Sequence, residues 1–427
     1  MDRTTNSRPG AADGPTPADH LTRDRVPLIP ETLLHQHACF VAGDTRFRAA
    51  SRLRQSLLRQ DLNLEPGLHR PGGTSSLPNT PLGSMLTPVD AARGFNFLSP
   101  AVHAFVHRSL ALREEGACVN IDRLFRNMLS SEPLVRNAFV PLALDLGLAT
   151  RVFARLLPDF VHQVEDIRFE TAPSRDRTDP RYLTDGTAFD AALSVITPDG
   201  EPATLFIEMK YTEVPGPAAR HRSRYDEASR QVALHRDPDA PALRSVMLEQ
   251  FWRLHLLADL SVRHGQTPRA HLLVLAPHLN RHVRTATRLY AAELLPPEAG
   301  RTGFSALTLE TFVAALREAG AQSQATYFHH RYLDLSTVLD LVLGGTAAAE
   351  AATAPVKPFP VLPSSVTDPN APASKSAPSN RAAPLRRRKA ANPSVSPSLP
   401  KPRRRKRTEA AAPTVEASPS KAKRRER

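Results

Sequence analysis

Three ionisable residues, Asp190, Glu208 and Lys210, lie in two apolar stretches that a short polar segment joins. The first stretch, 189–197, is rich in Ala, Leu, Val and Ile, and the second, 203–211, contains Leu, Phe, Ile and Tyr. Two neighbouring carboxylates repel each other unless a cation lies between them, and hard oxygen ligands suit Mg²⁺ better than Zn²⁺. The residue types therefore indicate a divalent-cation site, provided that the fold brings the two carboxylates together.

A β-hairpin would bring them together. Pro198, Asp199 and Gly200 suit a three-residue loop, a type I turn closed by a residue in the left-handed region, where glycine carries no steric penalty. Asp190 and Glu208 lie nine residues either side of Asp199, so the pairing sets them opposite each other on one face. The lysine two residues after Glu208 shares that face, and the alternate residues of its strand face the core.

The spacing Glu-x-Lys has a simpler interpretation, an ion pair on the solvent face of a sheet. Residues 1–356 contain one lysine, Lys210, against 37 arginines, so a surface ion pair in this chain is made with arginine. Arginine stays protonated in proteins, whereas a lysine near a metal can lose its proton or act as a compact point charge. The composition therefore favours a chemical role for Lys210.

The charge of the chain is concentrated at its C-terminal end. Residues 351–427 contain 14 prolines, long Ala/Ser tracts, 18 Lys and Arg and 4 Asp and Glu, a net charge of +14. The remainder has 38 basic and 39 acidic residues, a net charge of −1, and the two parts sum to +13. Such a composition buries too little apolar surface to offset chain entropy, so we expect a disordered tail and a nearly neutral folded part.

The pattern of the chain predicts four regions. They are a disordered leader (1–30), a helical N-terminal region with a long loop (31–128), a core (129–345) and the disordered Pro/Ala/Arg/Lys-rich tail (346–427). Helices are expected over 31–61, 101–115, 129–160 with a break at Pro141, 243–264, 283–295, 308–319 and 336–343; strands over 164–170, the hairpin and 270–277; and a long loop over 62–100. This order predicts a mixed α/β sheet flanked by helices.

The arginines at 46, 48, 52, 54 and 59 lie in the first expected helix. They fit a helix that contacts a nucleic-acid backbone, or an ordinary amphipathic helix with a solvated arginine face. The sequence leaves both interpretations open.

Other residue types limit the kinds of site. Cys39 and Cys118 form neither a disulfide scaffold nor a metal cluster, and with the polar N-terminus they favour a soluble protein of the reducing cytoplasm. The pairs His35/His37 and His329/His330 lack acids or cysteines at ligand spacing, so no zinc site is expected. No G-x-x-x-x-G-K-[ST] loop occurs, which argues against ATP-driven chemistry.

The Asp…Glu-x-Lys hairpin, followed by a helix and a strand, resembles the PD-(D/E)XK nuclease superfamily. More narrowly, the chain resembles a bacterial restriction-endonuclease-like family over about residues 35–343. The supporting stretches are ASRLRQSLLRQDLNLEPG, PLGSML, GFNFLSP, LSSEPLVRNAFVPL, FIEMKYTE, RYDEAS, LEQFWRLHLLADL and HLLVLAPHLN, in that order. Phe189 stands where the motif has proline, and Glu132 where the family usually has Gln.

The resemblance implies hydrolysis of a nucleic-acid phosphodiester by a metal-activated water. Asp190, Glu208 and the Met209 carbonyl would hold Mg²⁺, with Mn²⁺ as an alternative, and Lys210 would orient or deprotonate the water and stabilise charge on the phosphate. Accessory roles are expected for Glu132, Tyr211 and Glu213. Glu132 has a second interpretation, a carboxylate that favours the dipole of the helix it begins.

The expected partner is DNA, with RNA and a homodimer left open and no membrane. Arginines that could contact phosphates lie after the hairpin and in the tail, at Arg220, Arg222, Arg224, Arg386, Arg387, Arg388, Arg403, Arg404 and Arg405. For the first three, an exposed loop in an arginine-rich chain is the simpler explanation. The leading hypothesis is a Mg²⁺-dependent DNA endonuclease, and the alternative is a nucleic-acid-binding protein or scaffold with an idle nuclease fold.

Overall fold

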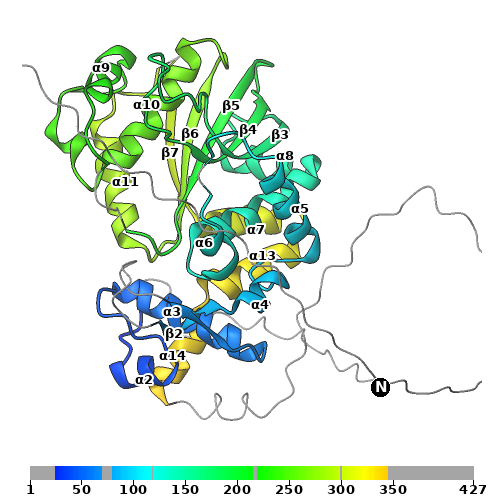
Figure 1. Ribbon diagram of the computed structural model, residues 1–427. Helices are drawn as coiled ribbons and strands as arrows, with labels where there is room; N and C mark the ends of the chain where they lie inside the picture. The colour runs from blue at the N-terminus through cyan, green and yellow to red at the C-terminus, as the bar shows by residue number, and fades with distance from the viewer. Residues whose placement is uncertain (1–24, 70–78, 118, 215–218, 299–300, 345–427) are drawn as a thin grey trace, which may run out of the picture. The chain divides into compact units, whose positions relative to one another are not determined.

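The computed structural model describes residues 25–69, 79–117, 119–214, 219–298 and 301–344, so the predictions for the leader and the tail lie outside the described residues. A five-stranded mixed sheet forms the centre, as the sequence predicted (Figure 1). Its order is β3 (Gln163–Thr171), β4 (Phe189–Ile196), β5 (Pro202–Met209), β6 (Ala270–Ala276) and β7 (Gly303–Thr308). Strands β3, β4 and β5 pair antiparallel, whereas β5, β6 and β7 pair parallel.

Helices cover both faces of this sheet. One face packs on α7 (Ser131–Leu144), α8 (Leu146–Leu156), α12 (Leu309–Glu318), α13 (Gln322–Phe328) and the π-helical turn η3 (His329–Leu333). The other packs on α10 (Glu249–Arg263) and α11 (Arg281–Glu293), with α9 (Ser223–Val232) and the short helix η2 (Pro241–Arg244) beside α10. Each face of the sheet therefore has its own apolar core.

The β4–β5 hairpin has the predicted register. Ala191 pairs with Ile207, and the ladder continues to Ile196 opposite Pro202. In the turn Gly200 adopts φ +86°, and its N–H donates to the Thr197 carbonyl at 2.9 Å. The residues of β5 that alternate with Glu208 lie in the core that contains α7 and α8, as expected.

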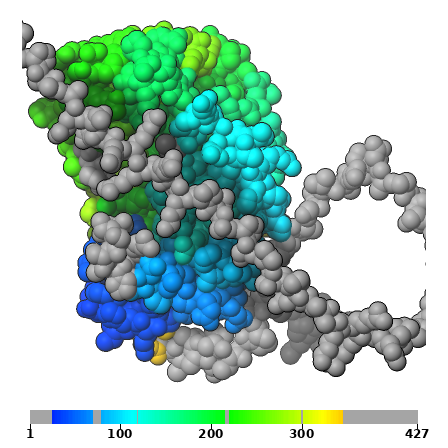
Figure 2. All heavy atoms as spheres, in the orientation of Figure 1, coloured from blue at the N-terminus to red at the C-terminus, as the bar shows by residue number. Residues whose placement is uncertain are grey.

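The N-terminal region contains structure that the sequence did not predict. The expected helix 31–61 is two helices, α2 (Glu31–Gln36) and α3 (Arg46–Asp61). The predicted long loop 62–100 contains β1 (Pro66–His69), β2 (Thr80–Leu86) and α4 (Pro88–Ala92), and α5 (Pro100–Ala111), α6 (Ile121–Arg126) and, much later in the chain, α14 (Ser336–Leu343) complete the elements. The strands were missed because Pro, Gly and Ser lower strand propensity, while pairing with each other and packing on α3 stabilises them. Figures 1 and 2 show α14 in yellow beside the blue N-terminal residues.

Three of the five arginines predicted in this region are not solvated, whereas Arg46 is exposed and Arg48 partly exposed. Arg52, Arg54 and Arg59 are buried, and each donates to a partner within the fold. Arg52 forms a two-bond contact with Asp44, with Nε–Oδ2 at 2.6 Å and Nη2–Oδ1 at 3.0 Å. Arg59 Nε donates to the Gly83 carbonyl of β2 at 3.0 Å. Because these guanidinium groups are used internally, neither interpretation made from the sequence describes them.

One further local prediction was wrong. Pro141 lies inside α7, which continues to Leu144 because the neighbouring Val140 and Leu142 are fully buried and offset the lost hydrogen bond. In the basic stretch after the hairpin, Arg220 and Arg222 are exposed in a loop, as the simpler explanation expected. From Ser223 the chain is helical as α9, whose apolar residues Tyr225, Ala228 and Val232 belong to the same core as α10. Among the described helices, none is long and apolar enough to cross a membrane.

Candidate active site

Three carboxylates lie in a row across neighbouring strands. Ala191 of β4 pairs with Ile207 of β5, so the preceding Asp190 stands opposite Glu208. On the other side of β4, Phe169 pairs with Ala191 and Thr171 pairs with Phe189, which leaves Glu170 of β3 opposite Asp190. Since side chains alternate along a strand, the register directs Asp190 and Glu208 to the same face of the sheet.

Asp190 is held by the end of β5. Its Oδ2 accepts a hydrogen bond from the Met209 backbone N–H at 2.8 Å. Met209 lies beyond the last β4–β5 pair, Ala191 with Ile207, so the Asp190 side chain accepts the hydrogen bond that a backbone carbonyl of β4 would accept within the sheet. Burial and the Glu208 carboxylate raise the pKa of Asp190 well above its usual range, although Lys210 and the Met209 N–H act in the opposite direction. The positive charge near Asp190 is therefore too small to keep the pKa of this buried carboxyl in its usual range.

Glu208 has two partners. Its Oε1 lies 2.5 Å from Lys210 Nζ and accepts from Gln250 Nε2 of α10 at 2.9 Å, and the residue is only 4% exposed. Burial lowers the pKa of Lys210, but the carboxylates of Glu208 and Asp190 outweigh it, so the net shift is upward. Lys210 is therefore an ammonium group in this arrangement and not half of a surface ion pair.

Arg136 of α7 lies beside the row. It is buried, its guanidinium stacks 4.6 Å from the centre of the Phe169 ring, and its charge acts on Glu132, Glu170 and Asp190. Nε and Nη1 are buried and have no hydrogen-bond partner among the described residues. Burial lowers the pKa of Arg136, and the carboxylates of Glu170, Asp190 and Glu132 act against this shift.

Glu132 lies at the start of α7, where both interpretations placed it. Ser130 is the N-cap, its Oγ accepting from the Glu132 N–H at 3.2 Å. Glu132 Oε1 lies 3.7 Å from Arg123 Nε, and its buried Oε2 has no partner in the part of the chain that the structure describes. Burial above all raises the pKa of Glu132 to about 7, with Glu170 and Glu213 adding to the rise. Glu132 thus combines a cap position with closeness to the acidic row.

A family model described as the PD-(D/E)XK nuclease superfamily matches residues 42–334. The chain belongs to this superfamily. The match includes the whole hairpin, and so the Glu208-Met209-Lys210 stretch in which the sequence predicts the (D/E)-x-K element. Comparisons with curated proteins and with solved structures gave no match.

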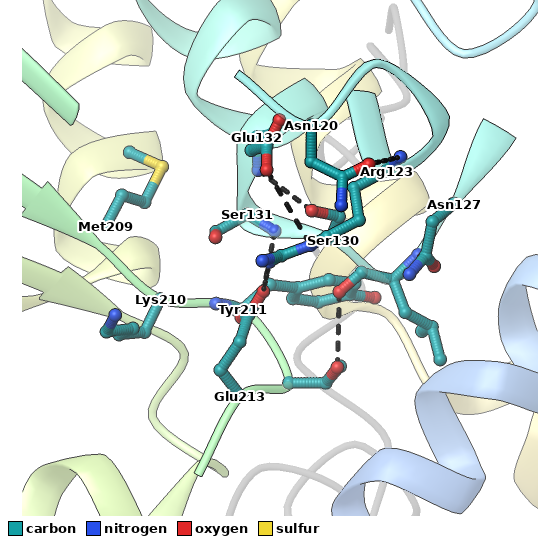
Figure 3. A network of polar contacts seen from close by, with 12 residues as sticks. Asn120, Arg123, Asn127, Ser130, Ser131, Glu132, Met209, Lys210, Tyr211 and Glu213 are labelled. Carbon is teal, nitrogen blue, oxygen red and sulfur yellow. Dashed lines mark hydrogen bonds and ion pairs between the residues drawn. The ribbon is translucent and has the colours of Figure 1, made fainter. Parts of the chain in front are cut away.

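In this superfamily member, Glu213 connects the hairpin to α7 (Figure 3). Its Oε1 accepts from the Ser131 N–H at 2.8 Å, and its Oε2 accepts from the Tyr211 N–H at 2.8 Å. Arg123 Nη2 lies 3.4 Å from Glu213 Oε1 and so connects this carboxylate with Glu132. Glu213 caps α7 and fixes the turn after Lys210, while Tyr211 is buried, with its hydroxyl 3.3 Å from Gln55 Nε2.

The arginines after the hairpin divide into two kinds. Arg222 and Arg224 donate to the carbonyls of Thr184 and Tyr182, at 2.6 Å and 2.9 Å, and so hold the loop before β4. Arg220 is exposed. The six tail arginines named above lie outside the described residues.

Sequence reasoning missed three residues beside the site: Glu170, Arg136 and Gln250. Gln250 was seen only as part of an amphipathic helix, and Glu170 only as the end of an expected strand. The one available signal was register, because a third strand paired with β4 must set one residue opposite Asp190. Arg136 was recognisable only from tertiary packing, since its burial depends on α7 meeting β3.

Proposed function

We propose that this protein is a Mg²⁺-dependent endonuclease that hydrolyses DNA phosphodiester bonds, with a role in restriction or defence. The observation that carries the proposal is the alignment of Asp190 and Glu208 on adjacent strands, with the single lysine of residues 1–356 bound to Glu208. Membership of a nuclease superfamily supports the same chemistry.

The residues present fit a hard divalent cation. Asp190 and Glu208, with Glu170 as a third carboxylate and the Met209 carbonyl, would hold Mg²⁺, and Mn²⁺ would bind the same oxygen ligands. The raised pKa of Asp190 and that of Glu170, to which burial contributes most, indicate a cluster short of positive charge. When bound, the ion would supply Lewis acidity and lower the pKa of a water.

Lys210 would act through its charge. Its ammonium group lies 2.5 Å from Glu208 Oε1, beside the proposed ligands, where it would stabilise negative charge that develops on the phosphate. Gln250 and Lys210 both hold Glu208 Oε1, so this carboxylate is oriented before substrate binds. Arg136 would keep positive charge behind Glu170 and Asp190 and limit their mutual repulsion.

A nucleic-acid partner is supported by charge. The tail carries +14, and exposed Arg220 follows the hairpin, so both could contact phosphates. DNA is the substrate that the proposal names, and RNA is the competing substrate to include in the assay.

The proposal is tested by incubating the purified full chain with supercoiled plasmid DNA or with RNA, in Mg²⁺ or in EDTA. We expect Mg²⁺-dependent cleavage of DNA that Asp190→Asn abolishes, while Asp176→Asn, an exposed aspartate away from the row, cuts normally. DNA binding without cleavage by the wild type would instead support an idle nuclease fold, and RNA cleavage would replace the substrate.

A further inference from the structure

A second group of ligand side chains lies away from the acidic row, at the end of α13. His329, His330 and Asp334 each offer one ligand atom, and these atoms lie within 4.8 Å of one another. The prediction that this histidine pair lacks a matching acid was wrong. Asp334 follows His330 by four residues, a spacing at which side chains on one helical turn meet.

The turn η3 brings the acid to the histidines. The Asp334 N–H donates to the His329 carbonyl at 2.8 Å, a bond across five residues that sets residue 334 one wide turn after residue 329. His330 Nδ1 lies 3.5 Å from Asp334 Oδ2. Two ligands of one zinc ion, each at about 2.0–2.2 Å, are roughly 3.3 Å apart in tetrahedral geometry, so this pair is already close to the required separation.

The carboxylate is oriented by its neighbours. Asp334 Oδ1 accepts from the Ser336 N–H at 2.9 Å and from Ser336 Oγ at 2.6 Å, while Oδ2 is the oxygen that faces His330. Metal-binding carboxylates are commonly held in this way, with one oxygen hydrogen-bonded and the other directed at the ion.

The backbone of the turn is fixed to the rest of the fold. Arg54 Nη2 donates to the His330 carbonyl, and Gln55 Nε2 donates to the Arg331 carbonyl at 2.6 Å. The buried Arg331 guanidinium binds Asn96 of the N-terminal region. Ligands on a fixed turn lose little entropy on binding an ion, and the imidazoles reach the surface, where an ion can enter.

We propose that His329, His330 and Asp334 bind Zn²⁺. Two imidazoles and one carboxylate with an open fourth position form the ligand set of an open zinc site, and imidazole prefers zinc, cobalt or nickel over the Mg²⁺ that suits the acidic row. Because Asp190 and Glu208 take no part, this site is independent of the proposed nuclease activity.

Calorimetric titration of the tag-free full chain with Zn²⁺, and with Co²⁺ to read the visible absorption of a coordinated ion, tests the proposal. We expect one ion per chain and a zinc-dependent rise in melting temperature. His330→Ala and Asp334→Asn should each weaken Zn²⁺ binding at least about tenfold, and Ser336→Ala about tenfold, the lower end for a residue that orients a ligand.

Two control variants locate the ion. His103 and His107 on α5 form another exposed pair, with Nε2 atoms 2.9 Å apart, so the double change to alanine tests a competing site. The proposal predicts that this double variant and Asp190→Asn both keep wild-type Zn²⁺ affinity. It is overturned if either control loses binding, or if His330→Ala and Asp334→Asn, shown to be folded by their melting in EDTA, bind Zn²⁺ as the wild type does.

Discussion

At the residue scale, the candidate active site has more negative than positive groups. The carboxylates of Glu132, Glu170, Asp190, Glu208 and Glu213 lie near the cations of Lys210, Arg123, Arg136 and Arg175. Full ionisation would therefore leave an excess of negative charge in a largely buried cluster. Proteins avoid this by raising pKa values or by binding cations. Without a metal ion, the raised pKa values of Glu132, Glu170 and Asp190 reduce the negative charge of the cluster. A bound cation would compensate the same charge.

Gln250 tests whether Glu208 must be oriented. Its amide donates to Glu208 Oε1 at 2.9 Å, so Gln250→Ala should reduce Mg²⁺-dependent cleavage about 10- to 100-fold, the usual effect of losing a residue that orients a metal ligand. The matched control is Gln231→Ala, which removes an exposed glutamine of α9. Cleavage rates and Mg²⁺ titrations would be compared, and equal rates for Gln250→Ala and wild type would show that orientation by this amide is unimportant.

At the element scale, the hairpin sets the register of the acids. Gly200 ends its turn at φ +86°, and a Cβ added there would meet no atom within 4 Å, so only backbone strain opposes a side chain. Gly200→Ala should lower the free energy of unfolding by about 1 kcal/mol, while Asn, which tolerates the left-handed region, should cost less.

Gly43 is the control for this prediction. A Cβ there also meets nothing within 4 Å, and its φ lies outside the left-handed region. Gly43→Ala should be neutral or stabilise the protein by up to about 1 kcal/mol, because it reduces the entropy of the unfolded chain. Denaturant unfolding measures the change in the free energy of unfolding for both variants. Equal changes would contradict backbone strain at residue 200.

The elements also show what sequence can predict. The hairpin and its register were predictable because turn chemistry and alternation are local. Strands β1 and β2, rich in Pro and Gly, were not, because their stability comes from pairing and from α3. In the same way Glu170 and Arg136 join the site only through contacts between distant elements. The pairing of Asp334 with His330, four residues apart, was by contrast recognisable from local spacing.

At the scale of the whole molecule, two buried histidines, His235 and His255, and the partly buried His271 couple stability to pH. Burial lowers the pKa of His235 to about 3 and that of His255 and His271 to about 4. The unfolded chain binds protons at these rings below about pH 6.5 whereas the folded chain does not, so stability should fall as pH drops through 6.5 towards 4.

His235→Gln tests this linkage. His235 lies 3.2 Å from the Tyr290 hydroxyl, a contact that a glutamine amide can replace, and its Nδ1 is buried without a partner among the described residues. The loss of unfolding free energy between pH 7.5 and 5.5 should be smaller in the variant by about 1 kcal/mol. Urea unfolding at both pH values measures it, and an unchanged difference would mean that His235 is protonated in the folded protein.

The tail is expected to govern non-specific DNA binding. Each phosphate neutralised adds about −0.9 to the slope of log affinity against log salt, so deleting residues 351–427, with their net charge of +14, should weaken binding and flatten this slope. Cleavage chemistry should survive, since no proposed catalytic residue lies there. Fluorescence anisotropy with duplex DNA over a range of salt measures both quantities, and an unchanged slope would contradict a binding role.

The most direct test of the central claim is the Mg²⁺-dependent cleavage rate of Lys210→Arg. Arginine keeps the charge but is larger and planar, so it cannot place a compact ammonium at Glu208 Oε1. Lys357→Arg, the next lysine along the chain, is the control, and circular dichroism and melting report folding. We predict that Lys210→Arg folds but cuts about 10²- to 10⁴-fold more slowly than wild type, with the control unaffected. A folded variant that cuts as fast as wild type would contradict the account.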